Sequence, residues 1–265
     1  MTERASYIFN IQNSHNTINE RTIKREVLKQ IVAEFVNENN ATINLNDGNI
    51  IHLGDDIPEY QALNIVIATR GRSGSSFLGH LLNSYPGTFY TFEPLWKKGE
   101  DKKIYNKNIL ERNQAIEIIQ RPLKCKPPEY DTNGFCVYNF RFWDTLKDTT
   151  WEERFQHYQK FFSNSCAKFP IRLVKTIRFA FEDTEKLLLD PQIGHTLKII
   201  FLFRDPRGIF QSYVSKVRWC NETDNTDKSG YSELCDISSF CNMIHDDVQA
   251  AMNIQERYPG KMFYH

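Results

Sequence analysis

The sequence has no excess of either charge sign. Its 265 residues include 33 Lys and Arg and 33 Asp and Glu, which gives a formal net charge of +0. This balance argues against a general nucleic-acid-binding protein, which normally carries surplus basic residues. Long apolar runs are also missing: Ile199–Phe203 is typical of the longest, whereas a bilayer-spanning helix needs about 20 apolar residues. Met1–Asn10 lacks the apolar core of a signal peptide.

Metal-binding and redox motifs are missing as well. None of the six cysteines forms a C-x-x-C pair, which removes support for zinc-ribbon and thioredoxin-like proteins. Spacing alone favours reduced thiols in the core, although an even count permits three disulfides. No H-E-x-x-H motif or i, i+4 His pair is present, so the sequence predicts no bound metal. The cysteines are Cys125, Cys136, Cys166, Cys220, Cys235 and Cys241.

Aromatic residues, in contrast, are plentiful. The 19 Phe, 12 Tyr and 4 Trp supply enough apolar surface for a folded core. The length suits one large α/β domain or two small ones. Residues 20–38 carry apolar side chains at four-residue spacing, which predicts an amphipathic helix. We therefore expect an N-terminal appendage over residues 1–61 and the main domain over residues 62–265.

Short apolar runs alternate with helical patterns along this main domain. Such alternation predicts a parallel sheet covered by helices on both faces. Ligands in this architecture bind beyond the carboxyl ends of the strands. The predicted strands are Asn64–Thr69, Phe135–Asn139, Arg172–Thr176 and Lys198–Phe203. Four predicted helices have apolar faces that contain, in turn, Phe77, Leu78, Leu81 and Leu82; Trp151, Phe155, Tyr158 and Phe162; Ile209, Phe210, Tyr213, Val214 and Val217; and Phe240, Ile244 and Val248.

The first strand runs into a small-residue loop that is typical of an anion site. Gly and Ser allow backbone N–H groups to converge on oxygen atoms, and the following helix dipole adds positive potential. Hydroxyl groups and the Arg72 guanidinium add further donors for phosphate or sulfate. The simpler alternative is a turn with Ser75 or Ser76 as the helix N-cap. The loop comprises Arg72, Ser73, Gly74, Ser75, Ser76 and Phe77.

Two other nucleotide-binding classes fit this loop poorly. A nucleoside triphosphatase needs G-x-x-x-x-G-K-[ST], with a lysine that reaches the terminal phosphates. Here Ser75 follows Gly74, and the neighbouring cations Arg70 and Arg72 precede that glycine. The dinucleotide-binding pattern G-x-G-x-x-G is absent too. Other P-loop-fold enzymes, such as a nucleotide kinase, stay as an alternative.

The strand Lys198–Phe203 leads into a second basic junction. Arg204 follows the strand, Pro206 suits the first turn of a helix, and Ser212 lies off the apolar face of that helix. Arg204 and Ser212 could therefore hold a second phosphate. The alternative is a surface pair of Arg204 with Asp205 beside a helix cap. The segment Glu222–Asp247 holds seven acids and one Lys, and we expect it to be a solvated loop and helix surface or, alternatively, to face a substrate.

Three motifs together resemble the Golgi carbohydrate 6-O-sulfotransferases over roughly residues 62–265. They are Arg72–Phe77, the segment Phe92–Trp96, and Arg204–Arg207 with Ser212. The resemblance implies a P-loop-like α/β sulfotransferase fold. It also implies 3′-phosphoadenosine 5′-phosphosulfate (PAPS) as the sulfate donor, without a metal. The expected activity is sulfate transfer to the 6-hydroxyl of N-acetylglucosamine, galactose or N-acetylgalactosamine, with N-acetylglucosamine favoured.

The resemblance also implies roles for individual residues. Arg72–Phe77 match the loop that binds the 5′-phosphosulfate, and Arg72 also carries a catalytic role by stabilising the leaving phosphate. Arg204 and Ser212 match the 3′-phosphate site, and Glu93 matches the position that deprotonates the sugar hydroxyl. Without the resemblance, the sequence favours the simpler alternative that Glu93 is a helix or turn carboxylate paired with a nearby cation. No role is assigned to Lys175 or Arg178.

Partners and location follow from the same resemblance. It implies a glycan or glycoprotein acceptor, no nucleic acid, and a Golgi-lumenal enzyme held to the membrane by an N-terminal anchor that these 265 residues do not include. In an oxidising lumen, some of the cysteines should be bridged. The resemblance also implies that another strand begins at Lys261–His265, where these residues stop, so we expect a catalytic domain truncated at its C-terminus. A catalytically silent glycan- or nucleotide-binding relative is the remaining alternative.

Overall fold

The computed structural model describes residues 62–85, 87–95, 109–127, 151–216 and 237–264. Several sequence-based predictions concern other parts of the chain. The amphipathic helix over residues 20–38 and the strand Phe135–Asn139 lie outside the described residues. So do Trp96, which ends the second motif, and most of the acidic segment that begins at Glu222. The appendage predicted over residues 1–61 stays a prediction for the same reason.

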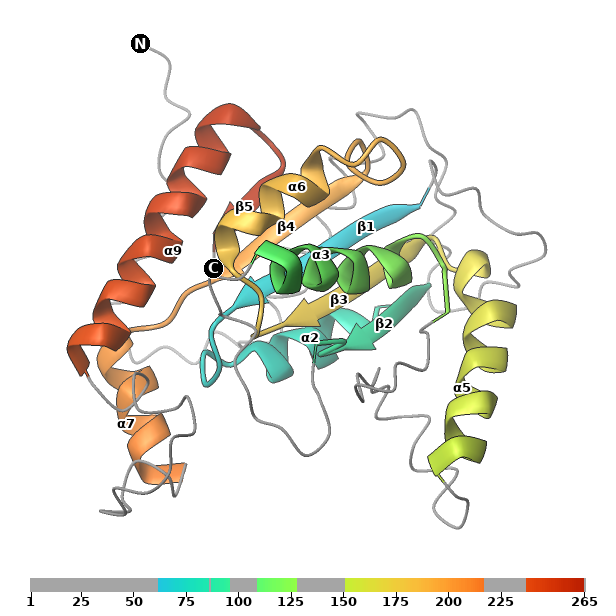
Figure 1. The fold of residues 1–265 in the computed structure, drawn as a ribbon, viewed down its shortest axis with the longest axis horizontal. Coiled ribbons are helices and arrows are strands. Elements are labelled where there is room, and N and C mark those ends of the chain that lie inside the picture. The colour runs from blue at the N-terminus through green and yellow to red at the C-terminus, as the bar shows by residue number, and fades with distance from the viewer. Residues whose placement is uncertain (1–61, 86, 96–108, 128–150, 217–236, 265) are drawn as a thin grey trace.

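A five-stranded parallel sheet forms the centre of the fold (Figure 1). The strands are β1 (Leu63–Thr69), β2 (Thr88–Phe92), β3 (Ile171–Thr176), β4 (Leu197–Leu202) and β5 (Met262–Tyr264), in the spatial order β2-β3-β1-β4-β5. The predicted α/β class is confirmed, and the predictions for β1, β3 and β4 are accurate to within one residue at each end. The strand anticipated at the C-terminus is present as β5. β2 was not predicted, because its sequence TFYTF interleaves threonines with aromatic residues.

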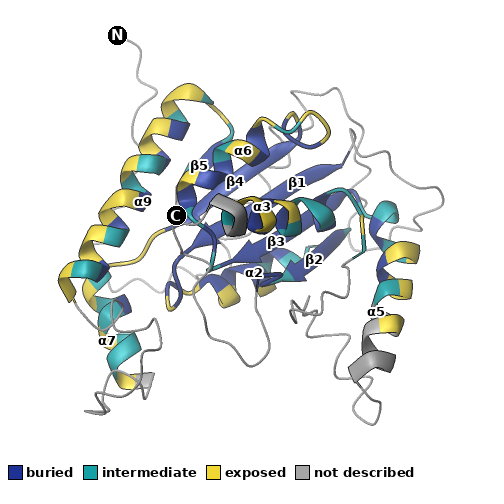
Figure 2. Ribbon diagram, viewed as in Figure 1, coloured by how far each residue is buried: buried dark blue, intermediate teal, exposed yellow. Residues whose placement is uncertain are grey.

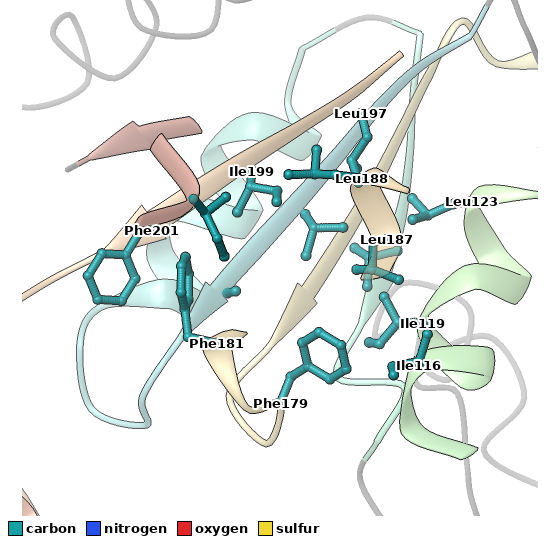
Figure 3. Close-up of a cluster of buried hydrophobic side chains, with 14 of the residues drawn as sticks. Ile116, Ile119, Leu123, Phe179, Phe181, Leu187, Leu188, Leu197, Ile199 and Phe201 are labelled. Atoms are coloured by element: carbon teal, nitrogen blue, oxygen red, sulfur yellow. The ribbon is translucent and has the colours of Figure 1, made fainter. Parts of the chain in front are cut away.

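Helices cover both faces of this sheet. α2 (Ser75–Asn83) packs on one face, where Leu78 and Leu82 join the apolar side chains of the strands. α3 (Ile109–Leu123), α6 (Thr184–Leu188) and α9 (Ile237–Arg257) cover the other face. Figure 3 shows that second core, in which side chains of α3 and α6 meet those of β4. Successive strand residues point to opposite faces of the sheet, and the central strands β1, β3 and β4 therefore contribute apolar side chains to the cores on both faces.

The remaining described elements lie around the sheet. α5 (Trp151–Ser165) ends in the short helix η2 (Cys166–Lys168), and α7 (Pro206–Lys216) packs against α9 through Ile209. Pro206 opens α7, as predicted, because a first helical residue needs no N–H donor. Figure 2 shows the strands almost wholly buried and the outer faces of α9 exposed. In the part of the chain that the structure describes, no helix has the length and apolarity needed to cross a membrane.

Two details of the predicted packing are wrong. Phe77 does not belong to the apolar face of α2: its side chain is 45% exposed, because Leu78 and Leu82 are the residues that face the sheet. The prediction of reduced core thiols fails for Cys125 and Cys166, which form a disulfide between the end of α3 and η2. Cys241 is free and exposed.

One basic residue of β3 and one of β4 lie near the amino edge of the sheet and not at its carboxyl edge. Arg172 is buried near the start of β3 and donates to the carbonyl oxygen of Leu123 at 2.9 Å. Lys198 is buried near the start of β4 and donates to the carbonyl oxygen of Gly260 at 3.0 Å. Both cations satisfy carbonyl groups near the amino edge and so lie away from the anion-type loop.

Candidate active site at the carboxyl edge of the sheet

Four adjacent strands carry the predicted site residues to one edge. Because all strands are parallel, their carboxyl ends lie on the same side of the molecule (Figure 1). Glu93 follows β2, Arg178 follows β3, Arg72 lies in the loop after β1, and Arg204 follows β4. Strand order rather than chain order therefore brings these residues together, with the loop of β1 between the ends of β3 and β4.

The loop after β1 has the backbone geometry of an anion-binding turn. Arg72 has φ 64° and Gly74 has φ 94°, both in the left-handed region. Alternation of this kind turns successive N–H groups toward one point, ahead of the N-terminus of α2. Gly74 is the N-cap of α2 and no side chain caps the helix, so the alternative with Ser75 or Ser76 as N-cap is wrong. The first N–H groups of α2 thus donate no hydrogen bond to a capping side chain.

The serine residues of this loop differ in burial. Ser73 and Ser75 are buried, and a hydrogen bond of 2.9 Å joins the hydroxyls of Ser73 and Thr69. Thr69 also donates to the carbonyl oxygen of Leu202 at the end of β4. Ser76 is exposed. Ser73 and Thr69 therefore hold the loop against the strand ends, whereas Gly74 and Ser76 at the helix N-terminus are exposed.

Gly71 allows α7 to approach the loop closely. A Cβ atom built on Gly71 would lie 2.3 Å from the hydroxyl oxygen of Tyr213 in α7. Real side chains do not reach this distance, so position 71 has no room for one without movement of Tyr213. The same helix carries Ser212, so the packing of Tyr213 helps to hold Ser212 beside the loop.

Arg72, Arg204 and Ser212 form one cluster that links the two predicted junctions. The Arg72 Nε donates to Ser212 Oγ at 2.9 Å, and Arg204 Nη1 donates to the Arg72 carbonyl oxygen at 3.0 Å. Arg72 and Arg204 are exposed residues, and Ser212 is half-buried. The sequence predicted each of the three residues, but their mutual contact is a result of the fold, because 140 positions separate Arg72 from Ser212.

Arg207 and Asp205 form a pair of their own. The Arg207 guanidinium donates to both carboxylate oxygens of Asp205, and this contact lowers the pKa of Asp205 to about 2. The suggested surface pair of Arg204 with Asp205 is therefore wrong, since Asp205 contacts Arg207 instead. Arg204 is directed toward the loop after β1.

Arg70 and Asp247 supply a contact that the sequence analysis missed. Arg70 donates from Nε and Nη2 to the two carboxylate oxygens of Asp247 in α9, and both side chains are buried. Burial raises the pKa of Asp247, while Arg70 and the backbone amide of Phe181 oppose this shift. The expectation of a solvated acidic surface over Glu222–Asp247 is thus wrong for Asp247. A buried carboxylate requires a cationic partner, and Arg70 is that partner.

Glu93 lies buried directly after β2 with a strained backbone. Its φ is 43°, and its N–H donates to the carbonyl oxygen of Lys175 at 2.8 Å. Its Oε1 accepts a hydrogen bond from Lys175 Nζ, and its Oε2 accepts one from Arg178 Nη1. Non-glycine residues in this region of φ and ψ are uncommon and gather at functional sites. In the described part of the chain, they are Arg72, Glu93 and Cys125.

Lys175 is buried in the middle of this edge. Its Nζ lies 4.3 Å from the centre of the Phe92 ring, in addition to its contact with Glu93. Burial lowers the pKa of Lys175, and the Glu93 carboxylate opposes that shift. Lys175 and Arg178 had no assigned role in the sequence. The available signal was their position, with Lys175 near the end of a buried strand and Arg178 just after it, but the sequence does not show which carboxylate they meet.

Comparison with known proteins identifies the family. A family model described as a sulfotransferase domain matches residues 63–264. The chain belongs to the sulfotransferase-domain family. It is 23% identical to mouse carbohydrate sulfotransferase 5 over 180 residues, which cover 57% of this chain and 44% of the relative. It is 25% identical to carbohydrate sulfotransferase 7 of mouse over 206 residues and of rat over 204 residues, with 62% of this chain and 41% of each relative covered.

The aligned part of this sulfotransferase domain thus spans less than half the length of these relatives. No solved structure matched the chain. The matched region begins at β1 and ends in β5, so it contains every described strand of the sheet. The carboxyl edge with its anion-type loop is therefore part of the family domain. Among the described residues, no group of three or more His, Cys, Asp and Glu side chains could hold a metal ion.

Proposed function

We propose that this protein transfers sulfate from PAPS to a sugar hydroxyl of a glycan or glycoprotein. The observation that carries the proposal is the cluster at the carboxyl edge, where the loop after β1 contacts Arg204 and Ser212 beside the helix N-terminus. PAPS carries two separate anionic groups, the 5′-phosphosulfate and the 3′-phosphate. The two basic junctions supply donors for two such groups within one continuous site.

The loop residues fit the 5′-phosphosulfate. The N–H groups at the start of α2 and the hydroxyl of Ser76 are accessible donors, and the helix dipole favours an anion there. PAPS supplies a sulfonyl group that is already activated by its bond to phosphate. Arg72 would stabilise negative charge that grows on the phosphate during transfer. Phe77, exposed beside this helix terminus, completes the proposed donor site with Ser73, Gly74 and Ser75.

Arg204 and Ser212 are proposed to bind the 3′-phosphate. Arg204 presents a planar guanidinium whose geometry matches phosphate oxygens, and it is exposed at the end of β4. Arg207, in the first turn of the following helix α7, is engaged by Asp205. Binding of the 3′-phosphate would exchange the Arg72–Ser212 hydrogen bond for contacts with the nucleotide.

Glu93 is proposed as the general base that accepts the proton of the sugar hydroxyl. It lies at the same edge as the loop, two strands away in the sheet. The relatives are carbohydrate sulfotransferases by name, which supports a sugar acceptor. We propose the 6-hydroxyl of N-acetylglucosamine as the acceptor position. The disulfide Cys125–Cys166 supports an oxidising compartment such as the Golgi lumen, because disulfides persist there.

Transfer of radiolabelled sulfate from PAPS to a panel of N-acetylglucosamine-, galactose- and N-acetylgalactosamine-terminated glycans tests the proposal. We expect transfer to one terminal sugar, with the label on its 6-hydroxyl by mass spectrometry. Arg72→Ala should lower kcat by about 10²- to 10³-fold. Glu93→Gln should lower it by about 10²- to 10⁴-fold.

Matched controls on α9 separate site effects from general ones. Glu256→Gln and Arg257→Ala change exposed side chains at the carboxyl end of α9. This end of α9 connects to the start of β5, at the amino edge of the sheet, whereas the proposed site lies at the carboxyl edge. Both should transfer sulfate at the wild-type rate. If 3′-phosphoadenosine 5′-phosphate raised the thermal stability of the protein but no sulfate were transferred, the protein would be a catalytically silent relative. If ATP with Mg²⁺ raised the thermal stability more than 3′-phosphoadenosine 5′-phosphate does, the protein would be another P-loop-fold enzyme and the proposal would be refuted.

A further inference from the structure

The Glu93 carboxylate is held by two cations that differ in their surroundings. Lys175 bonds to Oε1 and has a side chain 1% exposed, whereas Arg178 bonds to Oε2 and has a side chain 21% exposed. Both cations come from the carboxyl end of β3 or the turn after it. The two oxygens of one carboxylate therefore face different environments.

The Lys175 side of this arrangement is rigid. The Lys175 backbone pairs in register with Phe92 of β2 and Ile67 of β1, so its strand is fixed on both sides. The Lys175 carbonyl oxygen accepts the Glu93 N–H at 2.8 Å, and its ammonium packs on the Phe92 ring. Removing a partner from a buried charge leaves that charge uncompensated, which opposes separation of Lys175 from Glu93.

The Arg178 side can exchange partners more readily. Arg178 follows the end of β3 by two residues, and its partly exposed guanidinium has water available to replace a lost contact. Its contact with Glu93 is the one hydrogen bond that the guanidinium donates to a carboxylate in the described structure. A guanidinium also binds the oxygens of sulfate well, because its planar fork matches them.

We propose that Lys175 is the positioning residue for Glu93 and that Oε2, rather than Oε1, accepts the proton of the acceptor hydroxyl. This inference rests on the proposed function. When the acceptor enters, Arg178 leaves Oε2 and contacts the sulfonate oxygens. The hydroxyl proton passes to Oε2, and the electron pair of that O–H bond forms the new bond from oxygen to sulfur. The bond from sulfur to the 5′-phosphate oxygen breaks, and the phosphate keeps its electron pair.

A double-mutant cycle measures whether Lys175 acts through Glu93. Lys175→Met keeps the length of the buried side chain but removes its charge, and it should lower kcat by about 10²-fold with an unchanged Kd for 3′-phosphoadenosine 5′-phosphate. In a Glu93→Gln background the same substitution should change kcat less than threefold. Lys186→Met, at an exposed lysine of α6, is the control and should have no effect in either background.

The positioning role would be overturned if the two substitutions lowered kcat by independent factors, so that their effects on the activation free energy added in the double variant. Residues that act independently behave in this way. Arg178→Met should raise KM for PAPS and lower kcat together, since the proposal gives Arg178 a contact with the sulfonate. An unchanged KM would overturn that part of the proposal.

A crystal structure of Lys175→Met tests the placement without reference to turnover. We expect the Glu93 carboxylate to rotate away from its wild-type position while the β2–β3 pairing stays intact. An unmoved carboxylate would overturn the inference. An inactive wild-type protein would instead overturn the proposed function together with the proton transfer, and the structure of the variant would still decide whether Lys175 positions Glu93.

Discussion

Arg70 and Asp247, 177 positions apart, form a buried two-bond ion pair that ties the loop after β1 to α9. Arg70 directly follows β1 and directly precedes the Gly71–Arg72 turn. Asp247 also accepts a hydrogen bond from the backbone amide of Phe181, in the segment that follows β3. One carboxylate on a helix thus fixes the segments that follow two neighbouring strands.

Breaking this pair from one side should destabilise the fold strongly. Asp247→Leu leaves the buried Arg70 guanidinium without its carboxylate, and we expect a loss of about 3–5 kcal/mol in the free energy of unfolding. The double variant Arg70→Met/Asp247→Leu should recover most of this loss, because an apolar pair needs no compensating charge. Urea denaturation measures both values. A double variant as unstable as Asp247→Leu alone would contradict this account of the pair.

Arg204→Ala should weaken binding of the nucleotide through its 3′-phosphate alone. Isothermal titration should show at least a tenfold higher Kd for 3′-phosphoadenosine 5′-phosphate and an unchanged Kd for adenosine 5′-phosphate. The reason is that a lost charge-assisted contact removes about 1.5–3 kcal/mol from the ligand that makes it. Arg207→Ala, near the start of α7, is the matched control. Wild-type protein that binds the two nucleotides equally would contradict the assignment of this subsite.

Gly71→Ala should disturb the site through Tyr213. The added methyl group would lie 2.3 Å from the Tyr213 hydroxyl oxygen, so we expect α7 to shift and stability to fall by about 1–3 kcal/mol. Removing that oxygen in Gly71→Ala/Tyr213→Phe leaves the next ring atom at 3.3 Å and should recover part of the loss. Thermal unfolding of both variants and of Tyr213→Phe alone measures the coupling. Purely additive effects would show that Tyr213 does not limit position 71.

The Cys125–Cys166 bridge should stabilise the domain measurably. It closes a segment with a sequence separation of 41, for which the chain-entropy account gives about 4 kcal/mol. Cys125→Ser/Cys166→Ser should therefore unfold at lower urea, and reduction of the wild type should have the same effect. Alkylation of the native protein followed by mass spectrometry supplies the control, because exposed Cys241 should react while Cys125 and Cys166 do not. Full labelling of all three would contradict the bridge.

Local patterns identified three of the five strands because their sequences are continuous apolar runs. β1, β3 and β4 are buried on both faces, which requires apolar residues at most positions and makes them visible in sequence. β2 lacks this pattern, and Thr88 and Thr91 are buried within it. The motif loop was visible too, because Gly and Ser are the residues that a tight anion-binding turn requires.

Partners of charged residues could not be predicted in the same way. Three cations lie in or directly after apolar strands, but their partners differ in kind. Lys175 contacts the carboxylate of Glu93, directly after β2. Arg70 contacts the carboxylate of Asp247 in α9, and Lys198 contacts the backbone carbonyl group of Gly260. The sequence distance between such partners is large, and strand order decides which of them become neighbours. Phe77 shows the same limit for a helix face, since periodicity alone included it among residues that pack on the sheet.

The sequence by itself determined the class of the fold, the position of the anion-type loop at a strand-to-helix junction, and the resemblance that led to the sulfotransferase-domain family. These follow from short-range patterns, because burial of a strand and the geometry of a turn depend on neighbouring residues. The tertiary structure alone decided that Arg72, Ser212 and Arg204 touch, that Asp247 is buried against Arg70, and that Glu93 lies between Lys175 and Arg178. Those contacts depend on the order β2-β3-β1-β4-β5, which brings the carboxyl ends of strands distant in the chain to one edge.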